Sequence, residues 1–221
     1  MDFSRSEEHR MLLDTADRIA ADFPRDYYVR CAKAKIFPQE QWDALARAGI
    51  LGVNTPAAYG GAGMGMLELV LVQERMAEQG VAPLYFVVNQ GIAVPSISKH
   101  GTEEQKQRWL PAIASGAKRC CFAITEPNAG TNTFRIETVA TAAGDDFILN
   151  GNKLFISGIR DAHQVLVVAR TDSGGAQARA ELTLFVVDTN SAGLSWELMD
   201  TVLLNPEGQY FVYFDNVRVP R

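Results

Sequence analysis

Apolar residues recur at steps of three and four along the first half of the chain, which is the spacing of helices that bury one face. The clearest run includes Met11, Leu12 and Ile19. Ser4 and Glu7 precede it at the spacing of a capping box, in which two side chains bond backbone N–H groups at a helix start. The pattern therefore predicts an amphipathic helix early in the chain.

Further helix signals follow at regular intervals. Pro38 is tolerated in a first helical turn, and Gly49 favours a helix end. Residues 67–79 form another periodic run. Thr102 and Gln105 repeat the spacing of a capping box. These signals predict further helices throughout the first half of the chain.

Strand signals replace the helical ones after residue 118. The expected strands are residues 120–125, 134–142, 147–149, 153–157, 164–171, 182–187 and 210–214. Asn150-Gly151 separates two of them and predicts a hairpin turn, and Gly174-Gly175 predicts a mobile loop. Helices followed by strands indicate an α+β protein. We expect an all-helical domain over residues 1–118 and an antiparallel, barrel-like β domain over residues 119–221.

Composition and charge narrow the class of protein. The 221 residues are 47% hydrophobic and 21% charged, as in ordinary soluble globular proteins. The net charge of −5 argues against a general nucleic-acid binder, which would carry a basic face. The three cysteines are odd in number, which fits a reducing compartment, and we expect a cytoplasmic protein. Their spacing is not that of a zinc site.

The sequence also bears on membrane association. Its first residues are polar and acidic, unlike a signal peptide. Residues 80–98 carry no Asp, Glu, Lys or Arg, but they include Pro83, Asn89, Gln90 and Pro95. Such a segment is too polar to face lipid. We interpret it as a buried helix of a soluble protein and expect no membrane span.

Two other features give only weak evidence for a functional site. The glycine-rich stretch Tyr59–Gly65 resembles a dinucleotide-binding loop, but the third glycine of that fingerprint would have to stand at Met66. A flexible loop or helix entry explains the stretch better. His9, His100 and His163 are scattered without a triad or metal-ligand pattern, which favours surface or packing roles.

The segment Phe122–Asn132 is more informative. A strand runs into a turn of Pro, Asn and Gly, and such turns can direct successive backbone N–H groups at a phosphate. Thr125 and Thr131 add hydroxyl groups beside those donors. The alternative is an ordinary turn at a strand end with capping hydroxyls, and the residues alone favour it.

The segment Lys153–Ser157 carries an aromatic and a hydroxyl side chain two residues apart. Strand alternation would place Phe155 and Ser157 on one face, where a flat aromatic cofactor could rest against them. The alternative is a Phe that packs in the sheet core, and the residues alone favour it.

Considered together, these segments resemble the acyl-CoA dehydrogenase family of flavoproteins. The resemblance covers essentially the whole chain and is carried by five ordered segments. They are Leu51–Val53 with Tyr59–Gly61, Gly101–Pro111, Ala123-Ile-Thr-Glu-Pro-Asn-Ala-Gly130, Leu149–Ser157 and Phe214-Asp-Asn-Val-Arg-Val-Pro220.

The family resemblance implies an FAD-dependent α,β-dehydrogenation of an acyl-CoA thioester to the enoyl-CoA. It implies a helical domain, a β domain and then a C-terminal four-helix domain, which is missing from these residues. The family's catalytic base is a Glu of that missing domain, so we nominate no catalytic residue. We expect this chain alone to bind FAD weakly and to be inactive.

Site residues follow from the same resemblance. Thr125 would reach the polar edge of the flavin, Phe155 would lie against the isoalloxazine, and Ser157 would bond near flavin N5. Thr131 would also contact the acyl-CoA substrate, whereas Glu126 would be structural. The expected cofactor-binding residues are Phe122, Ile124, Thr125, Gly130, Thr131, Phe155, Ile156 and Ser157.

The chain departs from the family pattern at several positions. Asn132 replaces a usual Asp, Asn128 a common Gly, and residues 203–208 a Gly/Arg-rich stretch. The last departure could reflect an unusual substrate or subunit contact. The implied partners are acyl-CoA, electron-transfer flavoprotein or a similar acceptor, and other copies of the chain in a dimer or tetramer. The alternatives are a non-catalytic FAD- or partner-binding subunit and a fragment of such an enzyme.

Overall fold

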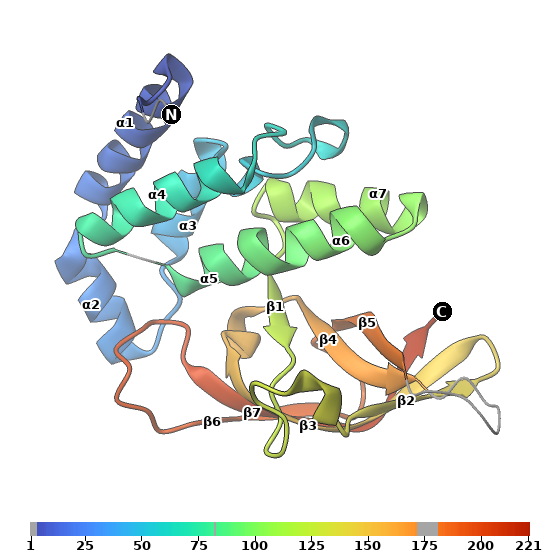
Figure 1. Cartoon of the computed structure of the whole chain (residues 1–221). Coiled ribbons are helices and arrows are strands. Elements are labelled where there is room, and N and C mark those ends of the chain that lie inside the picture. Colours follow the sequence, from blue (N-terminus) through green and yellow to red (C-terminus); the bar gives the residue numbers. More distant parts are fainter. Residues whose placement is uncertain (1–3, 82, 172–180) are drawn as a thin grey trace. The chain divides into compact units, whose positions relative to one another are not determined.

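The computed structural model describes residues 4–81, 83–171 and 181–221 (Figure 1). The chain divides into two compact units. The helical unit comprises residues 1–119 together with 204–207, and the β unit comprises residues 120–203 and 208–221. The loop predicted at Gly174-Gly175 lies outside the described residues.

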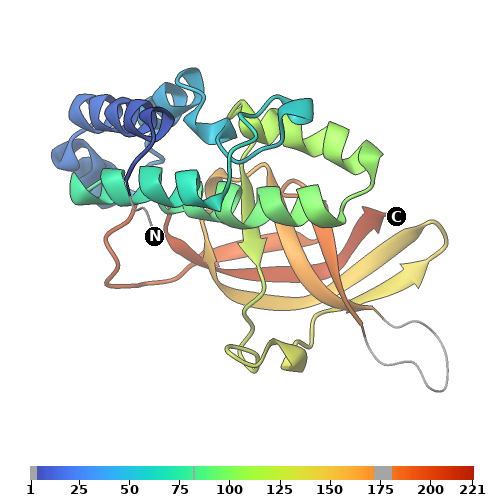
Figure 2. The same cartoon turned by 45° about the horizontal axis from the view of Figure 1, so that its top comes forward.

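The helical unit is built on amphipathic helices, as the apolar spacing predicts. Its longer helices are α1 Glu7–Asp22, α2 Arg25–Ala34, α3 Gln39–Arg47, α4 Met66–Glu78 and α7 Glu103–Ala114. Short 3₁₀ turns, Ile50–Gly52 and Ala57–Tyr59, follow α3. Helices α1 and α4 pack against each other (Figure 2). The core between helices includes Leu45, Val72, Met76, Leu110 and Ile113.

Helix starts follow the capping rules with one correction. Thr102 and Gln105 form the predicted capping box at the start of α7. The box predicted from Ser4 and Glu7 is wrong. Helix α1 begins at Glu7, so Ser6 is the N-cap, and its hydroxyl accepts a hydrogen bond from the backbone N–H of His9 at 3.1 Å. Two serines precede the helix, and spacing alone did not distinguish them.

The uncharged segment is helical from residue 84 to its end, and the last helix continues to His100, but the winding changes along it. It comprises α5 Leu84–Phe86, a π-helix at Val87–Ala93 and α6 Val94–His100. Pro95 lacks an N–H and its ring crowds the preceding turn, which a wider π turn accommodates. In the described part of the chain, no helix is both long and apolar enough to cross a bilayer.

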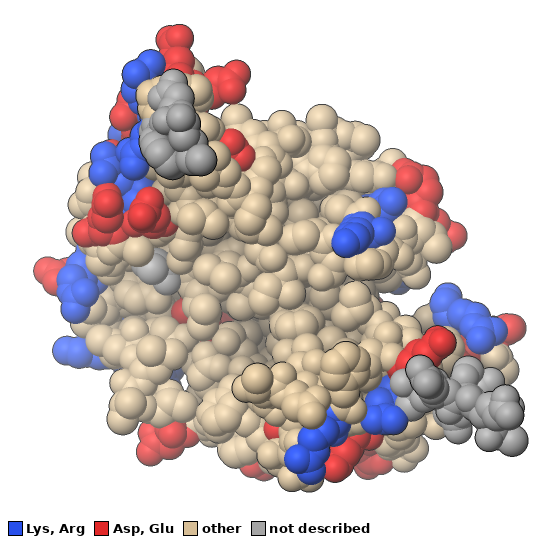
Figure 3. Space-filling model, viewed as in Figure 1, with Lys and Arg blue, Asp and Glu red and all other residues tan. Residues whose placement is uncertain are grey.

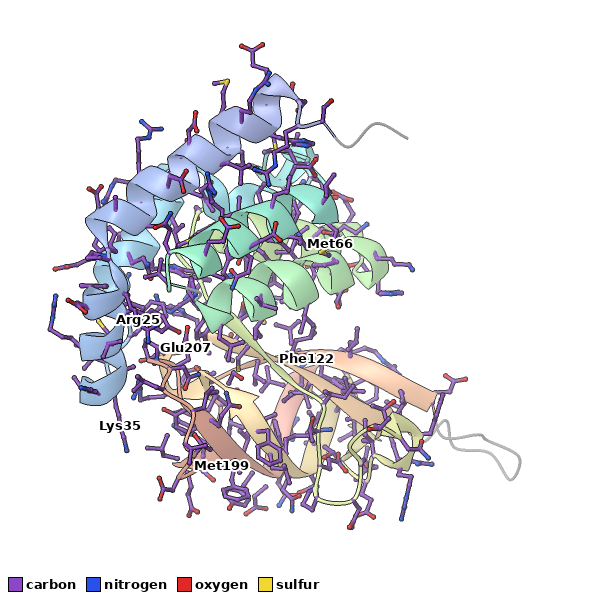
Figure 4. All side chains as sticks on the ribbon, turned by 60° about the vertical axis from the view of Figure 1, so that its left-hand side comes forward. Arg25, Lys35, Met66, Phe122, Met199 and Glu207 are labelled. Carbon is purple, nitrogen blue, oxygen red and sulfur yellow. The ribbon has the colours of Figure 1, made fainter. Side chains whose placement is uncertain are left out.

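Residues 204–207 belong to the helical unit although they lie far along the chain. Glu207 is fully buried, and its Oε1 accepts a hydrogen bond from the backbone N–H of Tyr85 at 3.3 Å. Burial, and then the charge of Glu207, raise the pKa of Tyr28 above its usual value. Figure 4 marks Glu207 beside Arg25 of α2.

The β unit is one seven-stranded sheet, strongly curved in Figure 2. Its strands are β1 Cys120–Ala123, β2 Val139–Ala143, β3 Asp146–Ser157, β4 Gln164–Thr171, β5 Glu181–Asp188, β6 Leu194–Leu198 and β7 Gln209–Pro220. Their order is β1-β4-β2-β3-β7-β6, with β5 paired to β4.

The sheet is mixed, which corrects the expectation of an antiparallel one. Pairs β2–β3, β3–β7, β4–β5 and β6–β7 are antiparallel, but β1 and β2 each pair with β4 in parallel. Strand β1 pairs with residues 164–167 of β4 and β2 with residues 170–171. The connection between β1 and β2 is thus long, and its residues are those of the predicted cofactor turn.

The predicted hairpin turn at Asn150-Gly151 is wrong, because β3 runs straight through it. The β2–β3 turn lies instead at Gly144, whose φ is +65°. Gly151 has φ +145° and lies where the β3–β7 register shifts. A Cβ there would stand 2.6 Å from Thr138 Oγ1. The glycine therefore permits a close approach of two chain segments rather than a turn.

Other strand boundaries also shifted. The predicted strand 134–142 is a 3₁₀ turn at Thr133–Arg135 followed by β2. Strand β7 extends well beyond the predicted 210–214, and β6 was not predicted. β6 lies at the sheet edge with a mostly exposed, mixed side-chain pattern, so it has no apolar signature.

Candidate functional site

The predicted site residues lie on two segments of the β unit. The first, residues 122–131, includes the end of β1 and the turn after it, and the second, residues 155–157, ends β3. The backbone N–H of Leu154 donates to the carbonyl of Thr125 at 3.0 Å. This bond brings the two segments together, although about thirty residues separate them in the sequence.

The turn after β1 is tight and presents its far side to solvent. Glu126 and Ala129 exchange two backbone hydrogen bonds of 3.0 and 3.1 Å, with Pro127-Asn128 between them. Gly130 and Thr131 are exposed. Within the described residues, their backbone N–H groups donate no hydrogen bond. A Cβ at Gly130 would meet nothing within 4 Å. The turn thus offers open backbone donors, as an anion site requires.

Asn132 closes this turn by capping. Its Oδ1 accepts a hydrogen bond from the backbone N–H of Phe134 at 3.2 Å, at the start of the 3₁₀ turn. Arg170 of β4 then donates to the carbonyls of Phe134 and Ile136 at 3.3 and 3.4 Å. A neutral Asn therefore fulfils the local bracing role without the charge of an Asp.

The apolar members of the first segment support the turn from beneath. Phe122 on β1 (Figure 4) and Ile124 are partly buried. They pack against the buried side chains of Ala129, Ile136 and Val168. These contacts fix the underside of the turn.

Phe155 is held out of the sheet core. Its backbone has φ +59°, a left-handed conformation that is unusual for an aromatic residue. The β3–β7 register shifts between Lys153 and Ile156, so simple alternation does not apply here. Phe155 is 56% exposed, whereas Ile156 is 2% exposed. The alternative of a core-packed Phe is therefore wrong, and the bulge presents an aromatic side chain at the surface of the unit.

Ser157 is half-buried and paired with Gln209 of β7 across the sheet. The Ser157 Oγ lies 2.9 Å from Nε2 and 3.1 Å from Oε1 of Gln209. Its hydroxyl is therefore oriented by one carboxamide. Gln209 was not among the predicted site residues, because a Gln at the start of an apolar strand carries no signal on its own.

A buried ion pair lies between the two segments. Lys153 Nζ is 2.8 Å from Glu126 Oε1, and the side chains are 0% and 3% exposed. Lys153 also donates to the carbonyls of Ile124 at 3.1 Å and Val168 at 2.6 Å. Three acceptors match the three N–H groups of an ammonium, so Lys153 is protonated here.

The carboxylate of Glu126 is equally well satisfied. It accepts hydrogen bonds from the backbone N–H groups of Glu137 at 2.5 Å and Thr138 at 3.0 Å. Burial by itself would raise the pKa of Glu126, but these bonds and Lys153 lower it below its usual value. Burial lowers the pKa of Lys153, and Glu126 opposes that shift. Glu126 has the contacts of a structural anion rather than of a base.

Other reactive groups form no second centre in the described residues. No group of three His, Cys, Asp or Glu side chains there could hold a metal ion. His9 bonds Glu68 at 2.8 Å. Cys31, Cys120 and Cys121 are buried, and burial raises the pKa of Cys120 to about 12. Basic side chains also do not gather into a patch on the face seen in Figure 3, where α1 carries both signs of charge.

Comparison with known proteins decides the family. The profile of the acyl-CoA dehydrogenase N-terminal domain matches residues 6–117, and that of the middle domain matches residues 121–217. The chain belongs to the acyl-CoA dehydrogenase family. Acyl-CoA dehydrogenase FadE12 of Mycobacterium tuberculosis (strain ATCC 25618 / H37Rv) is 43% identical over 218 residues, which are 99% of this chain and 56% of FadE12.

Solved structures of the acyl-CoA dehydrogenase family agree with the fold. An acyl-CoA dehydrogenase from Geobacillus kaustophilus gives a TM-score of 0.90 at 28% identity, over 100% of this chain and 58% of that one. A glutaryl-CoA dehydrogenase from Mycobacterium smegmatis, in complex with FADH2, gives 0.86 at 27% identity over 98% and 54%. The chain spans little more than half the length of FadE12 and of the Geobacillus kaustophilus enzyme.

Proposed function

We propose that this chain supplies the FAD-binding part of an enzyme that oxidises the Cα–Cβ bond of an acyl-CoA thioester to the enoyl-CoA. The observation that carries the proposal is the junction of the two predicted cofactor segments, made by the bond from Leu154 to Thr125. Family membership supports the chemistry. The proposed domains are residues 1–118 and 119–221.

The residues present fit a dinucleotide with a flat aromatic ring system. Open N–H groups at Gly130 and Thr131 suit a pyrophosphate, and Thr125 and Ser157 offer hydroxyls. The exposed ring of Phe155 suits contact with the isoalloxazine. Phe122, Ile124 and Ile156 complete the proposed contacts. When bound, FAD supplies the hydride acceptor for the reaction.

The chain's own part in the reaction is to bind and orient. Thr131 would contact the acyl-CoA as well as the cofactor. We assign no general base to residues 1–221. The resemblance assigns that Glu to a C-terminal four-helix domain, so the chain alone is expected to be inactive. Electron-transfer flavoprotein or a similar acceptor and a homo-oligomer are proposed on the same basis. A cytoplasmic location is proposed from the cysteine pattern.

The proposal is tested by incubating the purified chain with FAD, desalting it and recording its visible spectrum. Because the chain alone is expected to bind FAD weakly, we expect a partial flavin band, and a Gly130→Val/Thr131→Val variant should lose it. The absence of a band with the unaltered chain, confirmed by a fluorescence titration without saturation, would contradict the proposal. Turnover of acyl-CoA by this chain alone would contradict the assignment of the base elsewhere and favour a complete catalytic unit.

A further inference from the structure

The Glu126–Lys153 pair is a costly way to stabilise a fold. Moving a charged group out of water costs several kcal/mol even after relaxation, and well-packed apolar residues can often replace such a pair without loss. The pair nevertheless lies in the interior of the β unit, with all three ammonium donors and three carboxylate contacts used. Apolar residues at these two positions could not make these directed hydrogen bonds to the surrounding backbone.

The carboxylate closes the base of the cofactor turn. Glu126 begins the turn. Its carboxylate accepts hydrogen bonds from the backbone N–H groups of Glu137 and Thr138, which lie at the far end of the loop. Gly130 and Thr131, with their open donors, lie between these ends. One carboxylate therefore fixes both ends of the loop whose middle faces the proposed cofactor.

The ammonium connects that loop to the second segment. Lys153 of β3 bonds the carbonyl of Ile124, next to the turn, and the carbonyl of Val168 on β4, a strand that does not pair with β3. The next residue, Leu154, bonds Thr125, and Phe155 follows at the bulge. The position of the aromatic ring relative to the turn is thus set through Lys153.

We infer that Glu126 and Lys153 are a positioning pair for FAD, whose ion pair holds the phosphate-facing turn and the flavin-facing bulge in register. The inference rests on the proposed function. It assigns the pair no contact with the cofactor. The role of the pair is to pre-organise the site. Because of it, the chain without FAD already holds the two segments in the arrangement that binds the cofactor.

The test compares a double variant, Glu126→Leu/Lys153→Met, with the unaltered chain. Removing both charges avoids a stranded buried ion, so the fold is retained while the directed bonds are lost. A matched control, Asp146→Leu/Arg218→Met, removes another ion pair, which joins Asp146 at the other end of β3 to Arg218 of β7. Folding is followed by circular dichroism and FAD affinity by flavin fluorescence.

We expect the site variant to melt cooperatively and to bind FAD about 10- to 100-fold more weakly, by analogy with the loss of a group that orients a metal ligand. The control should bind as the unaltered chain does. Equal affinity of the folded site variant would overturn the inference and leave the proposed function standing. Failure of the unaltered chain to bind FAD would overturn both.

Hydrogen exchange decides the matter if the double variant does not fold. In the unaltered chain without FAD, the amides of Glu137 and Thr138 donate to the buried carboxylate. They should therefore exchange slowly, as parts of a pre-formed frame. Exchange of both at the rate of an unstructured peptide would overturn the inference.

Discussion

The Ser157 hydroxyl lies within hydrogen-bond distance of both ends of the Gln209 carboxamide, 2.9 Å from Nε2 and 3.1 Å from Oε1. A carboxamide can donate through its nitrogen or accept through its oxygen. If Nε2 donates, the Ser157 proton is free for another acceptor. If Oε1 accepts, that proton is occupied. The rotamer of Gln209 thus selects what Ser157 can offer a ligand.

Substitutions of Gln209 should separate these two states. Gln209→Glu supplies only acceptors, so it should hold the Ser157 proton and weaken FAD binding about fivefold, the value of one net hydrogen bond of about 1 kcal/mol. Gln209→Met offers no competing acceptor and should bind nearly as well as the unaltered chain. Fluorescence titration with FAD measures both. The same affinity for the two variants would show that Gln209 does not control Ser157.

Acid should weaken the β unit through Glu126. Its pKa is lowered in the folded state, because hydrogen bonds outweigh the effect of burial. The stabilisation by ionised Glu126 is therefore complete above its unfolded-state pKa of about 4.5. It is lost as the pH falls through its lower folded-state pKa. Glu126→Gln should cost about 3–5 kcal/mol at pH 7, since it strands Lys153, and less in acid. Urea unfolding at several pH values measures this, and a pH-independent difference would contradict it.

Two glycines of the β unit should respond differently to alanine. Gly151 has φ +145°, and a Cβ would stand 2.6 Å from Thr138 Oγ1 and 2.7 Å from Thr138 Cα. Gly151→Ala should therefore cost more than 3 kcal/mol, roughly the sum of backbone strain and overpacking. Gly144 has φ +65° and open space, so Gly144→Ala should cost about 1–2 kcal/mol. Equal losses of unfolding free energy would contradict the close approach at Gly151.

The cysteines should behave as interior residues. Cys120 and Cys121 have 0% exposure and Cys31 has 4%. Burial raises the pKa of Cys120 to about 12 and that of Cys121 well above its usual value. We expect Ellman's reagent to leave the folded chain unmodified at pH 8 and to label every thiol in guanidinium. Rapid labelling of Cys120 or Cys121 without denaturant would show that β1 opens readily.

The helical half was the easier part to predict because its signals are local. Thr102 and Gln105 are three residues apart and meet within one turn, so their capping box was legible in the sequence. The sheet depends on partners far along the chain. The parallel pairing of β1 with β4 joins Cys120 to Gln164, and no local pattern reveals it. Asn150-Gly151 has the residue types of a turn. The actual reason for a glycine there, its close approach to Thr138, involves a residue outside the local sequence pattern.

The candidate site was predicted in part. The residue types at Gly130 and Phe155 suggested an anion-binding turn and a cofactor-facing aromatic, but on their own they favoured the ordinary alternatives, and the family resemblance carried the assignment. The positive φ of Phe155 and the register shift beside it have no signal in the sequence. Lys153 was overlooked as a partner of Glu126. A cation directly before the apolar run Leu154–Ile156 is the signal that could have found it, since a buried charge there needs a buried counter-charge.

Residues 204–207 give the helical unit a second, remote piece of chain. The polypeptide passes from one unit to the other three times, after residues 119, 203 and 207. An excised fragment of residues 1–119 would therefore lack Glu207 and leave the Tyr85 amide without that acceptor. Neither unit is a contiguous stretch of sequence. A circular permutant or a pair of complementing fragments would therefore have to keep residues 204–207 available to the helical unit. After proteolytic cuts on both sides of residues 204–207, we expect this short peptide to stay bound to the helical unit through its own contacts.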